Sequence, residues 1–470
     1  MLGMLLWCLL FSPEHQTQQP REVARLVPWP LYAWCAFLLL FPLWSADPSV
    51  AWINLRGQWG ESILTWVLAW GAIFVLRSSR LGLWELALVS AAPVFLHILL
   101  LCMAWIGLLG PVFFAEPSLA SLWFTIRDAF SSSEAWKWQL KPFPMGFRGV
   151  EPMHGNLGYA ASQAMAIALA CACRAWSEGA GVKMVKACAL IGICFLSVLI
   201  AGSRGAVYFS LILIVMAIVL HFASSRMRNG SSLNRRWKPT IRQVLYGLAG
   251  LSSLLIFVGA LLHTAQRDER WYSMWDKLEL GWVMGNSTRI LCEGLSDVDE
   301  AVILSRYGNK GENYVEVLKA GLLEQDGARV LLMRAGSDMV VQFPWGLDGS
   351  RQAYQKRILQ VCGHPPVLAF SHAHQAWINL GLAFGWLGML LFAWLLVSFA
   401  IQGWRTLATE DWTGGLALFL LASFWGLRGF VDAVYQDHYL QMQAFFLLFL
   451  SLNNTSRRSR VSRGNPKYGA

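Results

Sequence analysis

Charged residues are scarce in this sequence, since only 14% of its 470 positions are Asp, Glu, Lys or Arg. Soluble domains carry about a quarter, so this deficit excludes an ordinary soluble enzyme. Hydrophobic residues make up 56% of the chain, and the mean hydropathy is +0.45. Many apolar runs approach the roughly 20 residues that a helix needs to cross a bilayer. We therefore expect an all-α polytopic membrane protein.

A concentrated basic surface is also missing, although the formal net charge is +10. The Lys and Arg residues sit in short loops between apolar runs rather than on one folded face, so we expect no nucleic-acid partner. Short loops rich in Lys and Arg are retained on the cytoplasmic side of a membrane. This rule orients all the predicted spans consistently and places the two longest polar stretches, 110–155 and 264–372, outside the cytoplasm.

The apolar runs divide the chain into parts. We expect about 10 to 12 transmembrane helices and assign ten of them, approximately at 28–46, 60–76, 84–109, 156–173, 185–201, 205–223, 242–263, 373–400, 413–430 and 439–452. The predicted parts are N-terminal transmembrane helices over 1–263 with an external loop at 110–155, a large external loop or cap over 264–372, C-terminal transmembrane helices over 373–453, and a basic cytoplasmic tail over 454–470. Helical patterns at 314–323 and 328–343 predict a folded external loop. Met1–Phe11 is too short for a span and stays unassigned.

Metal-binding signatures are absent as well. No HExxH motif or carboxylate cluster lies near the histidine pair His372 and His374. Metal-binding histidines on one helix usually stand four residues apart, so we expect no metal site. Burial and the positive end of the helix that follows favour the uncharged imidazole, and a neutral imidazole is what a general base requires. A histidine that merely caps the helix is the structural alternative.

An arginine stands in a tight external turn between two apolar helices. Arg204 is flanked by Gly202 and Gly205, and glycines allow a ligand or another part of the chain to approach the backbone closely. Charged groups at membrane depth tend to persist only with a partner or a task. Arg204 is therefore a candidate ligand-binding residue, and a side chain that only snorkels to the membrane surface is the alternative.

These motifs, in this order, resemble the bacterial O-antigen ligases. His374 and Gln375 are followed by nine residues and then by Gly385 and Gly388, which is similar to the family's His-(Asn/Ser/Gln)-x9-Gly-x-x-Gly signature. The Arg204 turn resembles the family's external Arg motif. Two further stretches are similar to family features, namely an Arg-led helix that ends in a Pro turn, Arg329 to Gly349, and the helix start Gly155 to Tyr159.

The resemblance implies a GT-C-like glycosyltransferase of the bacterial inner membrane, with a large periplasmic loop before the catalytic His and an active site on the periplasmic face. It implies a glycan donor linked to undecaprenyl diphosphate, a lipid A core acceptor, surrounding membrane lipid, and neither metal nor cofactor. By position, His374 would deprotonate the acceptor hydroxyl. Arg204 and Arg329 would bind the diphosphate.

Several residues remain secondary candidates. Arg289 is a second candidate for diphosphate binding, because the region 285–326 is longer than the family's compact loop. His372 and Gln375 flank the predicted base and are candidates for substrate binding. Arg428 forms an external cluster with Asp432, Asp437 and His438, either as a wall of the acceptor site or as a salt-bridged turn.

The two cysteines of the large external loop, Cys292 and Cys362, are permitted to form a disulfide in an oxidising compartment, although two cysteines alone do not establish one. Three alternative functions stay open. An O-antigen polymerase or a protein O-oligosaccharyltransferase would use the same donor with another acceptor. A polysaccharide transporter or flippase is disfavoured, because no inverted repeat or paired half-helix interruption is evident.

Overall fold

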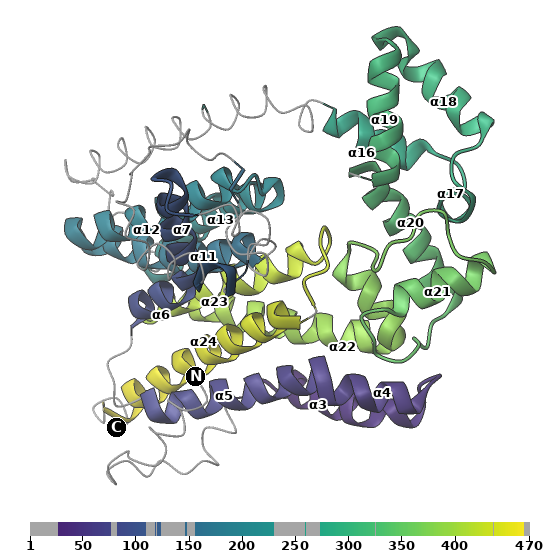
Figure 1. Ribbon diagram of the computed structural model, residues 1–470. Coiled ribbons are helices and arrows are strands. Elements are labelled where there is room, and N and C mark those ends of the chain that lie inside the picture. Colours follow the sequence, from purple (N-terminus) through teal and green to yellow (C-terminus); the bar gives the residue numbers. More distant parts are fainter. Residues whose placement is uncertain are drawn as a thin grey trace.

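The computed structural model describes residues 27–76, 82–109, 156–229, 273–324, 326–435 and 437–464, with the short pieces 118, 120–123, 146–147 and 259. Every regular element within these residues is a helix (Figure 1). The expected all-α class is therefore confirmed. Met1–Phe11, most of the predicted loop 110–155 and nearly all of the predicted span 242–263 lie outside the described residues.

Two groups of helices make up this structure. The apolar group comprises α3 (Trp29–Leu40), η1 (Phe41–Leu43), α4 (Pro48–Asn54), the π-helical turn η2 (Leu55–Trp59), α5 (Gly60–Leu76), α6 (Leu83–Ser90), α7 (Ala92–Trp105), α11 (Asn156–Glu178), α12 (Gly181–Ile200), α13 (Arg204–Asn229), α22 (Ala376–Thr406), α23 (Trp412–Arg428) and α24 (Asp437–Gly464). The second group, here called the α16–α21 cluster, comprises α16 (Met274–Val283), α17 (Ser287–Glu293), α18 (Asp297–Tyr307), η3 (Gly308–Lys310), α19 (Glu312–Glu324), α20 (Asp326–Gln342) and α21 (Ala353–Cys362).

Fewer helices qualify as membrane spans than the sequence led us to expect. Within the described residues, α12, α13 and α22 are long and apolar enough, and the bent pair α6 and α7 is a fourth candidate. Our ten to twelve assumed that each apolar run forms one straight helix. Instead, the predicted span 28–46 is interrupted where Pro42 ends α3 after 12 residues, and α5 and α23 reach only 17 residues.

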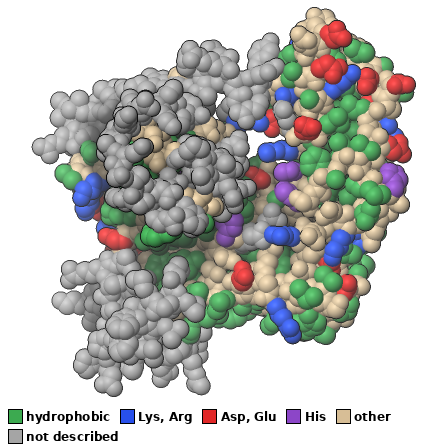
Figure 2. All heavy atoms as spheres, viewed as in Figure 1, with side chains coloured by type: hydrophobic (Ala, Val, Ile, Leu, Met, Phe, Trp, Pro, Cys, Tyr) green, Lys and Arg blue, Asp and Glu red, His purple; other side chains and the backbone are tan. Residues whose placement is uncertain are grey.

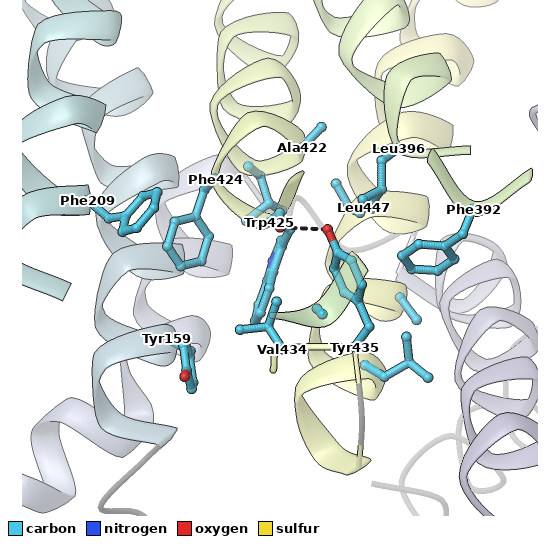
Figure 3. Packing of buried hydrophobic residues seen from close by; sticks show 14 of the residues in the cluster. Tyr159, Phe209, Phe392, Leu396, Ala422, Phe424, Trp425, Val434, Tyr435 and Leu447 are labelled. Atoms are coloured by element: carbon cyan, nitrogen blue, oxygen red, sulfur yellow. Dashed lines mark hydrogen bonds between the residues drawn. The ribbon is translucent and has the colours of Figure 1, made fainter. Parts of the chain in front are cut away.

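The core of the apolar group is built around α11 and α23. The first four turns of α11 are almost completely buried, because small alanines allow neighbouring helices to approach closely. Gln163 on α11 connects two neighbours, since its amide donates to Ser90 at 3.1 Å and accepts from the indole of Trp425 at 3.2 Å. Figure 3 shows the aromatic packing nearby, where the Tyr435 hydroxyl donates to the carbonyl of Trp425 at 2.9 Å.

The α16–α21 cluster lies on one side of the molecule in Figure 1, and α22 extends from it toward α23. The predicted helical patterns at 314–323 and 328–343 correspond to α19 and α20. Cys292 and Cys362 form a disulfide that joins α17 to α21, so the bond that the sequence only permitted is present. Arg334 on α20 donates to the last carbonyls of α16, including those of Gly281 and Met284. These links make the cluster a folded unit.

Candidate functional site

The backbone at His374 is strained. His374 lies two residues before α22 and has a φ of 51°, and it is the one non-glycine residue with positive φ in the part of the chain that the structure describes. A side chain in this left-handed region costs about 1 to 2 kcal/mol. Such strain persists only where surrounding contacts impose it, and it clusters at functional sites.

The imidazole of His374 is held in its neutral form. Its ring centroid lies 4.3 Å from that of His372, and the Nδ1 of His372 is 2.8 Å from the hydroxyl of Ser371. Burial, with the nearby His372 and Arg329 acting in the same direction, lowers the pKa of His374 to about 4, although Asp432 opposes the shift. Burial also lowers the pKa of His372. Both rings are therefore neutral at pH 7.

Arg329 approaches the histidines from helix α20. Gly336 lies seven residues after Arg329 and so on the same face of the helix, two turns further along. At Gly336 the helix touches the segment before α22, because a Cβ built there would lie 3.5 Å from that of Ala373. Arg329 is exposed and, within the described residues, makes no hydrogen bond or ion pair. Its guanidinium therefore remains available to an anionic ligand.

Arg204 is positioned by Asp326, a carboxylate at the start of α20. It is the first residue of α13, and its two terminal nitrogens lie 2.8 and 3.1 Å from the two carboxylate oxygens of Asp326. This paired geometry fixes the orientation of a guanidinium. Asp326 lies three residues before Arg329, so the pair places Arg204 and Arg329 at the same end of α20.

A third arginine is buried beside them. Arg428, only 6% exposed, pairs with Asp432 at 3.0 Å, and the Tyr159 hydroxyl donates to the same carboxylate at 2.6 Å. Burial alone would raise the pKa of Asp432, but Arg428 and Tyr159 outweigh it and lower that pKa. The absence of a side chain at Gly205 makes room for the guanidinium, whose Nη2 would lie 2.8 Å from a Cβ there.

The sequence candidates thus fall into two groups. Arg329 lies near the histidine pair, Arg428 is linked to it through Asp432, and Arg204 is linked to the start of α20 through Asp326. Figure 2 shows His and basic side chains along the hollow between the α16–α21 cluster and the other helices. Arg289 instead forms an ion pair with Asp299, at the start of α18. Within the described residues no contact links Arg289 to the histidines.

The remaining candidates are placed less centrally. Gln375 occupies the N-cap of α22, and its side chain makes no hydrogen bond to another described residue. The salt-bridged turn that we considered for Arg428 is formed by its pair with Asp432. His438 is exposed, and the side chain of Asp437 is outside the described set. Among the described residues there is also no cluster of three or more His, Cys, Asp or Glu side chains that could hold a metal ion.

The two signature glycines of α22 lie where other parts of the chain approach the helix closely. The helix is broken at Gly385, which has a φ of 72°, and the turn at Pro344 to Gly346 packs into this break. A Cβ on Gly385 would lie 2.6 Å from the carbonyl carbon of Trp345, and one on Gly388 would lie 3.0 Å from the ring of Phe37. Three backbone hydrogen bonds join the turn to the helix, namely Leu347 N to Ala383 O at 3.1 Å, Gly349 N to Ala383 O at 3.0 Å and Trp386 N to Pro344 O at 2.9 Å.

Comparison with known proteins agrees with this arrangement. Residues 189–393 match the family model described as O-antigen ligase. This match covers less than half of the chain and supports its membership of the O-antigen ligase family. The matched segment contains Arg204, Arg329, His374 and both signature glycines, whereas Arg428 and Tyr159 lie outside it. No match was found among curated proteins.

The match supports a membrane glycosyltransferase-like function within the O-antigen ligase and polymerase superfamily.

Two residues at the candidate site were not indicated by the sequence. Asp326 lies 122 residues from its partner Arg204, and no local pattern pairs them. Asn379 lies five residues after His374 inside an apolar helix, where a single amide is easily taken for ordinary helix packing.

Proposed function

We propose that this protein is an O-antigen ligase that transfers a glycan from undecaprenyl diphosphate to the lipid A core at the periplasmic face of the bacterial inner membrane. The observation that carries the proposal is a neutral, strained His374 beside Arg329, which forms no ion pair within the described residues. The disulfide between Cys292 and Cys362 supports the periplasmic placement, because disulfides persist in oxidising compartments.

His374 acts as the general base in this scheme. It takes the proton of the acceptor sugar hydroxyl, and the oxygen forms a bond to the anomeric carbon of the donor sugar. The bond between that carbon and the diphosphate breaks, and the diphosphate leaves with the electron pair, with inversion at the carbon. A positioned base typically contributes a factor of about 10² to 10⁴ in rate.

Arg329 and Arg204 bind the leaving diphosphate. Guanidinium groups meet phosphate oxygens through two parallel hydrogen bonds. Each charge-assisted contact contributes about 1.5 to 3 kcal/mol, so two that strengthen as the charge builds up give on the order of a hundredfold or more in rate. The scheme uses neither a metal nor a cofactor.

Donor binding also strengthens the base. Arg329 lowers the pKa of His374 in the free protein. A bound diphosphate offsets that positive charge, and a nearby negative charge favours the protonated imidazole. The pKa of His374 therefore rises toward neutrality when the donor arrives, which improves its ability to accept a proton.

The other candidates receive supporting roles. His372 and Gln375 border the acceptor, and Arg428 forms the wall behind the diphosphate through its contact with Gly205. Arg289 is assigned to stabilising the α16–α21 cluster, because its partner Asp299 belongs to that cluster and no contact among the described residues links Arg289 to the histidines.

Two other enzymes of the superfamily would use the same donor. A polymerase would pass the glycan to a second lipid-linked glycan, and a protein O-oligosaccharyltransferase would pass it to a protein hydroxyl. A transporter fits less well, because the charged side chains gather near helix ends rather than at the middle of the spans.

Reconstitution with a choice of acceptors tests the proposal. Purified protein in liposomes receives a glycan linked to undecaprenyl diphosphate together with lipid A core, an acceptor protein, or additional lipid-linked glycan. We expect glycan attached to lipid A core. Transfer only to protein or to lipid-linked glycan would overturn the ligase assignment, and translocation without transfer would favour a flippase.

A further inference from the structure

The two residues that flank His374 are both held by Asn379. The side-chain Oδ1 of Asn379 accepts a hydrogen bond from the backbone N–H of Ala373 at 3.1 Å. Its backbone N–H donates to the carbonyl of Gln375, also at 3.1 Å. One residue on the first turn of α22 therefore fixes the chain immediately before and immediately after the strained position.

Other contacts fix the surroundings of this turn. The N–H of Ala376 lies 2.8 Å from the carbonyl of Gly429 and 3.0 Å from that of Asp432, which ties the start of α22 to the end of α23. Ala373 is completely buried and faces Gly336 on α20. Neither contact spans His374 itself, whereas the hydrogen bond between Ala373 and Asn379 does.

The nitrogen of the Asn379 side chain makes no competing hydrogen bond to any residue that the structure describes. This Nδ2 is buried and, within the described residues, has no partner. It lines a small cavity of about 20 Å³, which it shares with Ser350, whose buried hydroxyl also lacks a partner in the described part of the chain. Within the described residues, the side chain of Asn379 thus forms hydrogen bonds only to the turn that carries His374.

We propose that Asn379 is a positioning residue that holds His374 in its left-handed conformation and so aims the imidazole at the acceptor hydroxyl. The proposal rests on the function proposed above for His374. It assigns no contact between Asn379 and the substrate. A displacement of about 1 Å at a reacting group can cost on the order of 10²-fold in rate, so one lost hydrogen bond in this turn has a measurable effect.

Two substitutions at this position and one neighbouring control provide the test. Asn379→Leu has a similar size but no acceptor for Ala373. Asn379→Asp keeps the acceptor and adds a negative charge. Ser350→Ala changes the same cavity without touching the turn. Initial rates of glycan transfer to lipid A core are measured across pH in liposomes, with the unfolding temperature of each variant recorded.

We expect kcat of Asn379→Leu to fall by about 10²-fold, with the KM for the lipid-linked donor within about twofold of wild type. Asn379→Asp should recover most of kcat at alkaline pH, with its acid limb moved to higher pH, because a carboxylate favours the protonated imidazole. Ser350→Ala should behave as wild type. A carboxylate remote from the imidazole would not shift the acid limb of a folded variant.

Three results would overturn the inference. They are a wild-type kcat in Asn379→Leu, equal losses in Asn379→Leu and Ser350→Ala, or an acid limb in Asn379→Asp that coincides with that of wild type. A failure of the proposed function is distinguishable from these, because wild type and Ser350→Ala would then both transfer no glycan to any lipid A core acceptor.

Discussion

Substituting Gly385 by alanine should separate α22 from the turn that precedes it. Gly385 has a φ of 72°, and a Cβ there would lie 2.6 Å from the carbonyl carbon of Trp345 and 2.9 Å from the nitrogen of Gly346. These are backbone atoms on the other side of a packed contact, so a change of side-chain rotamer cannot relieve the clash. Either the turn moves or the helix changes its break.

The loss of stability expected for Gly385→Ala follows from the backbone strain that it adds and the hydrogen bonds that it breaks. Gly385 has φ 72° and ψ −176°, a region essentially restricted to glycine, and another residue there costs about 1 to 3 kcal/mol. The three backbone hydrogen bonds that join the turn to the helix contribute about 0.5 to 1.5 kcal/mol each. Losing all of them brings the total to roughly 2.5 to 7.5 kcal/mol. Because the turn at Pro344 lies between Arg329 and His374 along the chain, activity should fall together with stability.

The measurement is thermal unfolding of the purified protein in detergent, together with glycan transfer at a temperature where both proteins are folded. Gly192→Ala is the matched control, since Gly192 lies within α12 and a Cβ there has no neighbour within 4 Å. The control should unfold at or slightly above the wild-type temperature, because alanine favours helix. If Gly385→Ala matched Gly192→Ala in both measurements, the proposed contact between turn and helix would be wrong.

Three further predictions concern charge, pH and redox state. Arg204→Lys should lower the transfer rate about 10- to 100-fold, because an ammonium cannot reproduce the paired hydrogen bonds to Asp326. An unchanged initial rate would show that Arg204 is not needed for transfer and would favour a snorkelling side chain. Burial and its neighbours lower the pKa of His374 to about 4 in the free protein, and kcat/KM for the donor reports the free protein. This quantity should therefore hold as the pH falls from about 7 to about 5 and drop only near that pKa; a kcat/KM profile that halves near about 6.5 would contradict this. The Cys292–Cys362 disulfide joins residues 70 apart, and its reduction should lower the free energy of unfolding by up to about 4 kcal/mol. The protein should then unfold at a lower temperature in dithiothreitol. Cys292→Ser should unfold at that lower temperature with or without reductant.

The sequence predicts most of what depends on local pattern. Apolar periodicity correctly predicts the helices α19 and α20, and the position of His374 at the start of a long apolar helix agrees with α22. Hydropathy does not reveal where a helix breaks. The interruption at Pro42 follows from the proline itself, whereas the internal break at Gly385 depends on the packing of the distant turn at Pro344.

Contacts between residues far apart in the chain cannot be predicted from a single sequence. Arg204 and Asp326 are 122 residues apart, and no local sequence pattern around either residue indicates the other as its partner. The reason for Gly346 and Gly385 is also visible only when the two backbones are seen in contact. The sequence favoured Arg329 over Arg289 only because Arg329 precedes the helix and the Pro turn that lead to His374, whereas the structure shows Arg289 paired with Asp299.

The transfer rate of His374→Ala, measured beside its affinity for the lipid-linked donor, addresses the central claim most directly. Liposomes with wild type or variant receive the same donor and lipid A core, and donor binding is measured without acceptor. We predict that the variant binds donor within about threefold of wild type but loses transfer by a factor of about 10² to 10⁴. Transfer at the wild-type rate by His374→Ala would contradict the assignment of this imidazole as the base.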